Sequence, residues 1–330
     1  MEQNTHGMVS EAKRCYTILG IALFAIAVIT VLVQVVLAVT ARLWASMGLD
    51  FVSSTWFSWL STFVPLYLVG VPIGLLILHR VPTVLRSKVK LGGKNFWVLL
   101  LMCFPMMYFG NLVGTLLSIV LSGGSAQNAL LNYAMDTSVL KIVVMVILAP
   151  LVEEYVFRKQ VIDRCVRYGE NSAILFSAIT FALFHMNLFQ FFYAFGMGLI
   201  FAYAYTRTHS LRYPVIMHMI INFMGSVLAP WVLSHVDLEA LANMNPQAID
   251  EAALASLLPG LLLLLGYAAL QMGLAITGLV LLIVKGRQLV FLPVEEELPK
   301  THRLRVVCGN VGFMLFTFFC IVIFAVNLFS

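Results

Sequence analysis

Nine apolar stretches, each close in length to a membrane-spanning helix, run along the chain of 330 residues. A helix needs roughly 20 predominantly apolar residues to cross the hydrocarbon core of a bilayer. Because backbone polar groups in lipid must be satisfied within the segment, we expect each stretch to be helical. The sequence predicts an all-α polytopic membrane protein with about nine transmembrane helices, near residues 16–39, 56–78, 96–122, 139–157, 172–188, 189–206, 214–234, 257–284 and 306–329.

The composition supports an integral membrane protein. Hydrophobic residues make up 61% of the chain and charged residues only 11%, whereas the apolar share of soluble domains stays near half. The first apolar stretch is too long for the core of a signal peptide and has no convincing small-residue cleavage site. We therefore expect it to remain in the protein as the first span, and the lipid bilayer to be the protein's solvent.

Lys and Arg fall in short clusters between alternate spans, which indicates topology rather than a phosphate-binding surface. We therefore expect no nucleic-acid partner. The positive-inside rule places the N-terminus and all the basic connections in the cytoplasm and the C-terminus outside. Merging the fifth and sixth stretches would break this alternation, so we predict two separate helices there. The basic clusters are Lys13/Arg14, Arg80/Arg86/Lys88/Lys90/Lys94, Arg158/Lys159/Arg164/Arg167, Arg207/Arg212 and Lys285/Arg287/Lys300/Arg303/Arg305.

Several ionisable or strongly polar residues lie within or beside the spans, where one such side chain costs on the order of 2.5 to 3.5 kcal/mol. Residues four apart share a helix face, so Glu154 can pair with Arg158. Glu153 is turned away by about 100° and is left free for chemistry. The outliers are Glu153, Glu154, Arg158, His185, His218 and Asn222, all between residues 153 and 222.

Helix geometry predicts that Glu153 and His185 lie at similar depth. Each is 16 residues from Gly169, in a predicted turn, which corresponds to about 24 Å of helix on either side. Phe181, one turn before His185, can shield it. His218 lies closer to its own connection, so it meets them only if that connection is deeper or if the fourth helix projects into the cytoplasm.

A carboxylate beside an imidazole in a low-dielectric pocket can activate water, and a second His with an Asn on one helix face can supply donors to an oxyanion. These parts suit peptide hydrolysis. Other interpretations stay open: interhelical hydrogen bonds, a purely structural Glu154–Arg158 pair, a proton-coupled transporter, or a non-catalytic scaffold or immunity protein.

Three short motifs carry a family resemblance. They are "EEYVFR" from Glu153 to Arg158, "FALFH" from Phe181 to His185 and "HMIIN" from His218 to Asn222. In this order they resemble the EExxxR, FxxxH and HxxxN motifs of the CPBP family, the intramembrane proteases related to CAAX prenyl endopeptidases and to bacteriocin-processing and abortive-infection proteins. The resemblance implies that this protein is located in a bacterial cell membrane.

The resemblance implies a four-helix catalytic core at residues 139–235. We therefore expect three parts in the chain: residues 1–138 with three spans, this core, and residues 236–330 with two spans. The resemblance also implies an endopeptidase that acts on peptides or on membrane-anchored, including prenylated, proteins. Glu153 would be the general base, His185 its partner, and His218 and Asn222 the oxyanion donors. Glu154, Arg158 and Phe181 would support the site.

Metal use stays a separate question. No HExxH motif and no CxxC pair is present. Glu153, His185 and His218 could in principle form a His2Glu zinc set, since catalytic zinc usually has three protein ligands. The resemblance favours a glutamate-type reaction without a cofactor, and zinc is the alternative.

Overall fold

The computed structural model describes residues 2–84, 86–128, 130–136, 138–242, 251–294 and 296–329, and every regular element among them is a helix. The all-α prediction is therefore confirmed. Many large apolar side chains are exposed along the helices, for example Leu68, Leu76 and Phe109, each at least 70% exposed. Such a surface is stable against lipid and not against water, so this is an integral membrane protein.

Seven of the nine predicted spans are helices long and apolar enough to cross a membrane within the described residues. Two predicted spans differ, so the count of nine is not confirmed. Residues 172–188 form a helix of only 15 residues, α9 (Glu170–Phe184). Residues 139–157 belong to a continuous helical run that is rich in charge at its centre. The seven are His6–Ser46, Thr55–Leu78, Gly93–Ser122, Leu188–Thr208, Arg212–Leu233, Ala255–Gly286 and Val311–Phe329.

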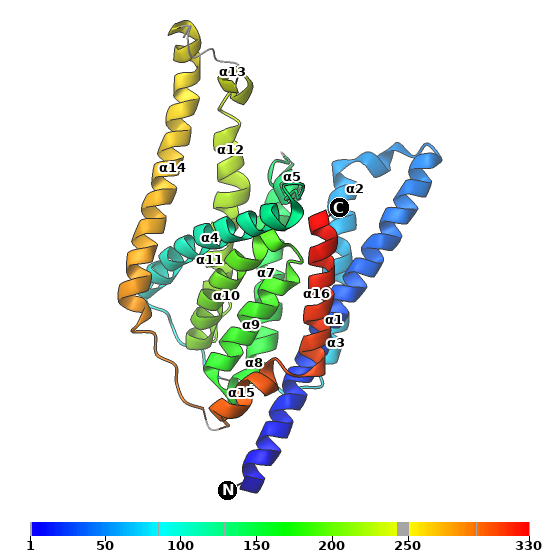
Figure 1. The fold of residues 1–330 in the computed structure, drawn as a ribbon, viewed down its shortest axis with the longest axis vertical. Helices are drawn as coiled ribbons and strands as arrows, with labels where there is room; N and C mark the ends of the chain where they lie inside the picture. The colour runs from blue at the N-terminus through cyan, green and yellow to red at the C-terminus, as the bar shows by residue number, and fades with distance from the viewer. Residues whose placement is uncertain are drawn as a thin grey trace.

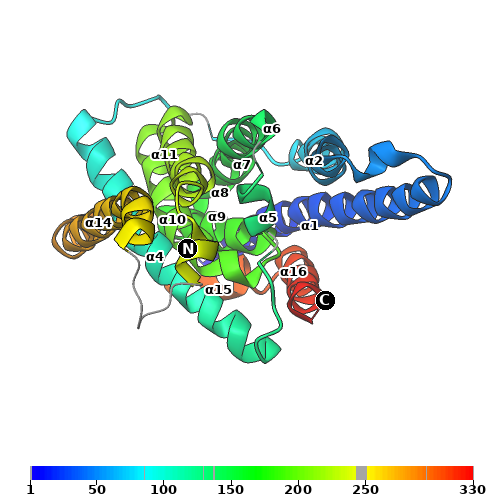
Figure 2. The ribbon, with the colours of Figure 1, turned by 90° about the horizontal axis from the view of Figure 1, so that it is seen from above.

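The motif-bearing helices occupy the middle of the molecule (Figure 1). They are α9, α10 (Leu188–Thr208), α11 (Arg212–Phe223) and the run formed by α6 (Val139–Lys141), η3 (Ile142–Leu148), α7 (Ala149–Glu154), η4 (Tyr155–Gln160), α8 (Val161–Cys165) and η5 (Val166–Tyr168). α10 packs against α9 and against the long helix α4 (Gly93–Ser122), which in turn packs against α14 (Glu251–Gly286). Figure 2 shows α14 on one side of this centre and α1 (Glu2–Ser46) on the other.

The other elements flank this centre. α1 packs against α16 (Val311–Phe329) and against η2 (Pro65–Gly70) and α3 (Val71–Leu78), which continue α2 (Thr55–Val64). Gly312 allows the closest approach: a Cβ built there would lie 2.0 Å from the Thr17 carbonyl oxygen of α1. The remaining short elements are η1 (Asp50–Ser53), α5 (Leu130–Ala134), η6 (Met224–Leu228), α12 (Ala229–Leu233), α13 (Leu238–Ala242) and α15 (Lys300–Val307).

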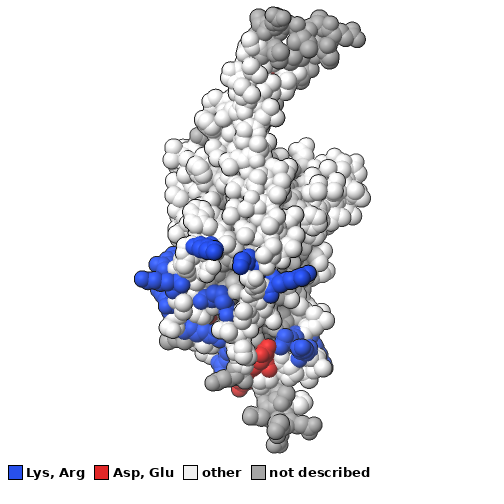
Figure 3. Space-filling view, turned by 90° about the vertical axis from the view of Figure 1, so that its left-hand side faces the viewer, with Lys and Arg blue, Asp and Glu red and all other residues white. Residues whose placement is uncertain are grey.

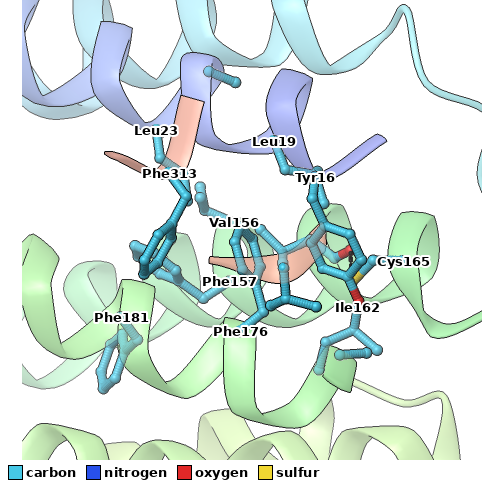
Figure 4. Packing of buried hydrophobic residues seen from close by; sticks show 14 of the residues in the cluster. Tyr16, Leu19, Leu23, Val156, Phe157, Ile162, Cys165, Phe176, Phe181 and Phe313 are labelled. Atoms are coloured by element: carbon cyan, nitrogen blue, oxygen red, sulfur yellow. Dashed lines mark hydrogen bonds between the residues drawn. The ribbon is translucent and has the colours of Figure 1, made fainter. Parts of the chain in front are cut away.

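Figure 4 shows the core between α1 and the motif helices. Tyr16, Leu19 and Leu23 of α1 are fully buried and belong to one cluster with Phe157 and Phe176. The ring of Tyr16 meets the edge of Phe176 at 5.0 Å between centroids. Lipid tails are as apolar as these side chains, so the close van der Waals packing of this cluster is what holds the central helices against α1.

Prolines explain three of the four π-helical segments among the described residues. η2, η3 and η6 each end two residues before a proline: Pro72, Pro150 and Pro230. Proline has no N–H to donate and its ring clashes with the carbonyl four residues earlier, so the preceding turn widens. η4, which contains Arg158, has no such proline.

A sharp break separates α9 from α10, as the charge pattern predicts. Met186 has a positive φ of 49°, and the Asn187 side chain accepts a hydrogen bond from the backbone N–H of Phe189 at 2.9 Å. A left-handed residue followed by an Asn cap ends one helix and begins the next. His185 is therefore held at the end of α9.

Basic side chains collect at one end of the molecule. On one face, Figure 3 shows Lys and Arg across the lower half and a white upper half. At this end the buried Glu170 joins three segments: it pairs with Arg207 of α10, lies 3.6 Å from Arg86 and accepts a 2.7 Å hydrogen bond from the N–H of Leu292. Nearby, Arg167 donates two hydrogen bonds that hold the pKa of the Glu296 carboxyl below its usual value.

Candidate active site

Glu153 and Glu154 are neighbours in α7 but lie in different environments. The Glu154 side chain is fully buried, whereas that of Glu153 is 19% exposed. Adjacent residues on a helix point about 100° apart, which explains how one carboxylate is enclosed while the other stays accessible. Glu153 is the carboxylate that a substrate or water can reach.

Glu154 forms an enclosed ion pair with Arg158, as the four-residue spacing predicts. The Arg158 Nε donates to Glu154 Oε2 at 2.8 Å, and Nη1 donates to the Ser177 hydroxyl at 2.7 Å. Ser177 in turn donates to the Phe157 carbonyl at 2.7 Å. The guanidinium lies over the ring of Phe181, 4.6 Å from its centroid. A buried charge persists only when it is paired and hydrogen-bonded, and both conditions are met here.

His218 of α11 lies between the two carboxylates. Its Nδ1 donates to Glu154 Oε1 at 3.0 Å, and its Nε2 lies 3.8 Å from Glu153 Oε2. The ring is 4% exposed, stacks on Phe201 at 5.3 Å and meets Phe181 edge-on at 5.9 Å. A carboxylate at Nδ1 fixes that nitrogen as the donor, so Nε2 is the ring atom that faces Glu153.

His185 is half-buried at the end of α9. Its Nδ1 donates to the Phe181 carbonyl at 2.9 Å, and its ring stands at 88° to the Phe181 ring, 4.8 Å away. Phe181 thus contacts both histidines and Arg158, so the residue expected to shield His185 packs against three of the motif side chains.

Asn222 lies one turn beyond His218 on α11. Its Nδ2 donates to the Met145 carbonyl at 2.8 Å. Met145 is in η3, where the widened turn before Pro150 makes a carbonyl available. One of the two amide hydrogens is used in this bond, so Asn222 is oriented and keeps a second hydrogen to donate.

The structure brings Glu153, Glu154, Arg158 and His218 into direct contact, and Phe181 places His185 beside them. Glu153 is in contact with His218, whereas the sequence predicted His185 as its partner. Sequence reasoning missed Ser177, Phe201 and the Met145 carbonyl. A signal existed for Ser177, because Ser177, Phe181 and His185 are spaced by four along one face of α9.

The zinc alternative would require a group of three protein ligands. Among the described residues, no three His, Cys, Asp or Glu side chains are grouped so that they could hold a metal ion. All five cysteines are free. Glu153 with Nε2 of His218 is the closest approach to such a set.

A cavity of about 270 Å³ opens between α3 and the run that follows Glu153. Leu75, His79 and Thr83 line one side, and Tyr155, Lys159, Gln160, Asp163 and Arg164 line the other. A larger cavity of about 450 Å³ lies at the basic end beside Arg86, Arg167 and Glu296 and contains no motif residue. The lining of the smaller cavity includes Tyr155, two residues after Glu153 in the sequence.

The sequence of this site is similar to that of a known protease family. Residues 135–224 match the family described as "Type II CAAX prenyl endopeptidase Rce1-like", which confirms the resemblance carried by the three motifs. The matched family is, by its description, one of endopeptidases, and the match spans less than a third of the chain.

One curated relative is similar over part of the chain. Over 110 residues the chain is 37% identical to the membrane-embedded CAAX protease MroQ of Staphylococcus aureus (strain USA300), an alignment that covers 31% of this chain and 42% of the relative. The chain thus spans less than half the length of the curated relative it matches. No solved structure matches the chain.

Proposed function

We propose that this protein is a glutamate-dependent intramembrane endopeptidase in which Glu153 is the general base. The observation that carries the proposal is the position of His218, whose Nδ1 is fixed by the buried Glu154–Arg158 pair while Nε2 faces the accessible Glu153. A base that is reachable, next to an imidazole that is held in one orientation, is the arrangement that water activation requires.

The reaction proceeds by attack of water on a peptide carbonyl. Glu153 accepts a proton from the water, the oxygen forms a bond to the carbonyl carbon, and the carbonyl π electrons move onto its oxygen. When the carbon–nitrogen bond breaks, the proton held by Glu153 passes to the leaving amine. His185, with Nδ1 committed to the Phe181 carbonyl, keeps Nε2 available to orient the water or relay the proton.

His218 and Asn222 are proposed to stabilise the oxyanion. Because Nδ1 of His218 already carries a hydrogen that bonds to Glu154, Nε2 can donate only when the ring is protonated. The free hydrogen of the Asn222 amide would be the second donor, and each such donor contributes on the order of 10²-fold to rate.

The test is comparative peptidomics of cells that carry the wild-type protein, Glu153→Gln or Glu11→Gln. We expect a set of peptides to disappear with Glu153→Gln and to persist with Glu11→Gln, which changes an exposed carboxylate near the N-terminus. Unchanged peptides in the Glu153→Gln cells would overturn the proposal. If the Glu153→Gln protein fully replaced the wild-type protein in cells, the result would favour a non-catalytic scaffold. If a proton-coupled flux survived the loss of cleavage, the result would favour a transporter.

We propose that the reaction needs no metal ion, with a zinc-dependent reaction as the alternative. Each His Nδ1 is engaged by a protein oxygen, which is equally compatible with a zinc ligand, so the donor set alone does not decide between the two. We expect 1,10-phenanthroline to leave cleavage of the identified peptides intact and elemental analysis of the purified protein to find less than stoichiometric zinc. Stoichiometric zinc whose removal abolishes cleavage would reverse this assignment.

A further inference from the structure

A serine hydroxyl lies behind the buried ion pair, on the helix that carries His185. Ser177 is fully buried and lies on the same face of α9 as Phe181 and His185, one turn and two turns before them. Its hydrogen bonds join α9 to η4, where its partners are Arg158 and the Phe157 carbonyl. Ser177 is part of none of the three motifs, yet it contacts a motif side chain directly.

The chemistry of the partners fixes the direction of each hydrogen bond at Ser177. A guanidinium can only donate, so Ser177 Oγ accepts from Arg158 Nη1 at 2.7 Å. A carbonyl can only accept, so the hydroxyl hydrogen points to Phe157 at 2.7 Å. Without the hydroxyl, a donor of a fully buried guanidinium would lose its partner, which is unfavourable.

The pairing between Arg158 and Glu154 is one-sided. Arg158 Nε is 2.8 Å from Glu154 Oε2, whereas Nη2 is 3.5 Å from Oε1. In a symmetric guanidinium–carboxylate fork both distances would be about 2.7 to 2.9 Å. Oε1 is instead the oxygen that accepts from Nδ1 of His218, at 3.0 Å. The two oxygens of Glu154 therefore serve different partners.

The bond to Ser177 explains this one-sided pairing. A guanidinium is planar and rigid, so an acceptor at Nη1 fixes the angle at which the Nε–Nη2 edge meets the carboxylate. The guanidinium carbon lies over the Phe181 ring, 4.6 Å from its centroid, which restricts tilting out of the plane. Rotation within the plane is the freedom that Ser177 removes.

We propose that Ser177 is a positioning residue for the proposed hydrolysis. Its hydroxyl holds Arg158 on Oε2 of Glu154 and so leaves Oε1 to His218. Without the hydroxyl, the fork would close on both oxygens and would compete for the one that anchors Nδ1. The inference rests on the proposed function of Glu153 for its effect on rate, whereas its effect on His218 can be measured without a substrate.

Three variants separate the hydroxyl from its packing. Ser177→Ala removes the hydroxyl, and Ser177→Cys fills the same place with a thiol, which is only a weak donor and acceptor. Thr180→Val is the matched control, because Thr180 is fully buried on the same helix and its hydroxyl bonds to carbonyls of α9 itself, those of Phe176 and Ser177. All three are compared with wild type at equal amounts of folded protein.

The first measurement is ¹⁵N NMR of histidine-labelled protein in detergent micelles. His218 is one of seven histidines, and its signals are identified by their absence in His218→Gln. We expect Nδ1 of His218 to carry a hydrogen in the wild type and in Thr180→Val. A second form, with the hydrogen on Nε2 alone, should appear in Ser177→Ala and Ser177→Cys. An unchanged His218 spectrum in Ser177→Ala would overturn the proposal and leave the proposed function standing.

The second measurement is turnover of a peptide that is lost from Glu153→Gln cells. We expect kcat to fall about tenfold in Ser177→Ala and Ser177→Cys with KM changed less than about twofold, and Thr180→Val to match wild type. Wild-type kcat in either Ser177 variant, or an equal fall in Thr180→Val, would overturn the role of the hydroxyl. Peptides unchanged by Glu153→Gln would remove the proposed function and the role of Ser177 in it together, whatever the NMR spectra show.

Discussion

The two adjacent glutamates, Glu153 and Glu154, have different roles in the proposed site. Glu154 is enclosed with Arg158 and anchors one nitrogen of His218, while Glu153 meets the other nitrogen and the accessible space. The buried pair therefore acts at a distance from the reacting atoms, by fixing which nitrogen of His218 is available. An uncharged pair of similar size could replace it in packing but not in this orienting role.

Replacement of Arg158 by Met tests that distinction. The Glu154 carboxylate would keep only its His218 partner in a fully buried position, and we expect a loss of about 3 to 5 kcal/mol of stability, measured as a lower thermal midpoint in detergent micelles. The double variant Glu154→Leu, Arg158→Met should recover most of the midpoint, because well-packed apolar pairs replace buried ion pairs at little cost. It should nevertheless stay inactive. A double variant with wild-type turnover would show that His218 needs no anchor.

Much of this site could be predicted from residue spacing. The Glu154–Arg158 pair follows from their four-residue separation, and the predicted turn at Gly169 is where the motif-bearing run ends and α9 begins. The bond between His218 and Glu154 could not be predicted, because it joins residues 64 positions apart and depends on how deeply α11 packs.

At the level of helices, the widened turns expose backbone carbonyl groups that would be hydrogen-bonded within a regular helix. The η3 turn before Pro150 presents the Met145 carbonyl to Asn222, and thereby links the start of the motif-bearing run to α11. An extra residue in a turn rotates everything before it relative to everything after it. The relation between Met145 and Glu153 therefore depends on η3.

Pro150→Ala should regularise this turn and remove the Asn222–Met145 bond. We expect turnover to fall about tenfold or more with the protein still folded, because small displacements of positioning groups cost rate. Pro259→Ala is the matched control, since Pro259 lies inside α14 far from the motifs and should leave turnover unchanged. Cleavage of the peptides identified by peptidomics is the measurement. Equal turnover in the two variants would argue against a role for η3.

The helix count shows where sequence reasoning reached its limit at this scale. Apolar length predicted seven of the spans, and the charge pattern predicted the separation of α9 from α10. It misjudged α9, because the apolar pattern continued through Met186 while the left-handed turn ended the helix at Phe184. A period in hydrophobicity does not reveal a backbone break that depends on an Asn cap.

For the whole molecule, the orientation in the membrane stays a prediction that rests on the basic side chains gathered at one end. Arg42 and Lys141 are exceptions, since they lie at the far ends of α1 and of the motif-bearing run. We expect green fluorescent protein fused after Lys90 to fluoresce, and alkaline phosphatase fused after Asp50 or after the C-terminus to be active outside. Phosphatase activity at Lys90 with none at Asp50 would invert the topology.

The pairing of α16 with α1 has a consequence for chain continuity. α16 packs on α1 rather than on α14. The connection between α14 and α15 is held by hydrogen bonds to Glu170, Arg167 and Tyr168. A cut in that connection would therefore leave both pieces with their partners. Two co-expressed fragments, divided at residue 290, should reassemble into one protease, and neither fragment alone should have a complete fold.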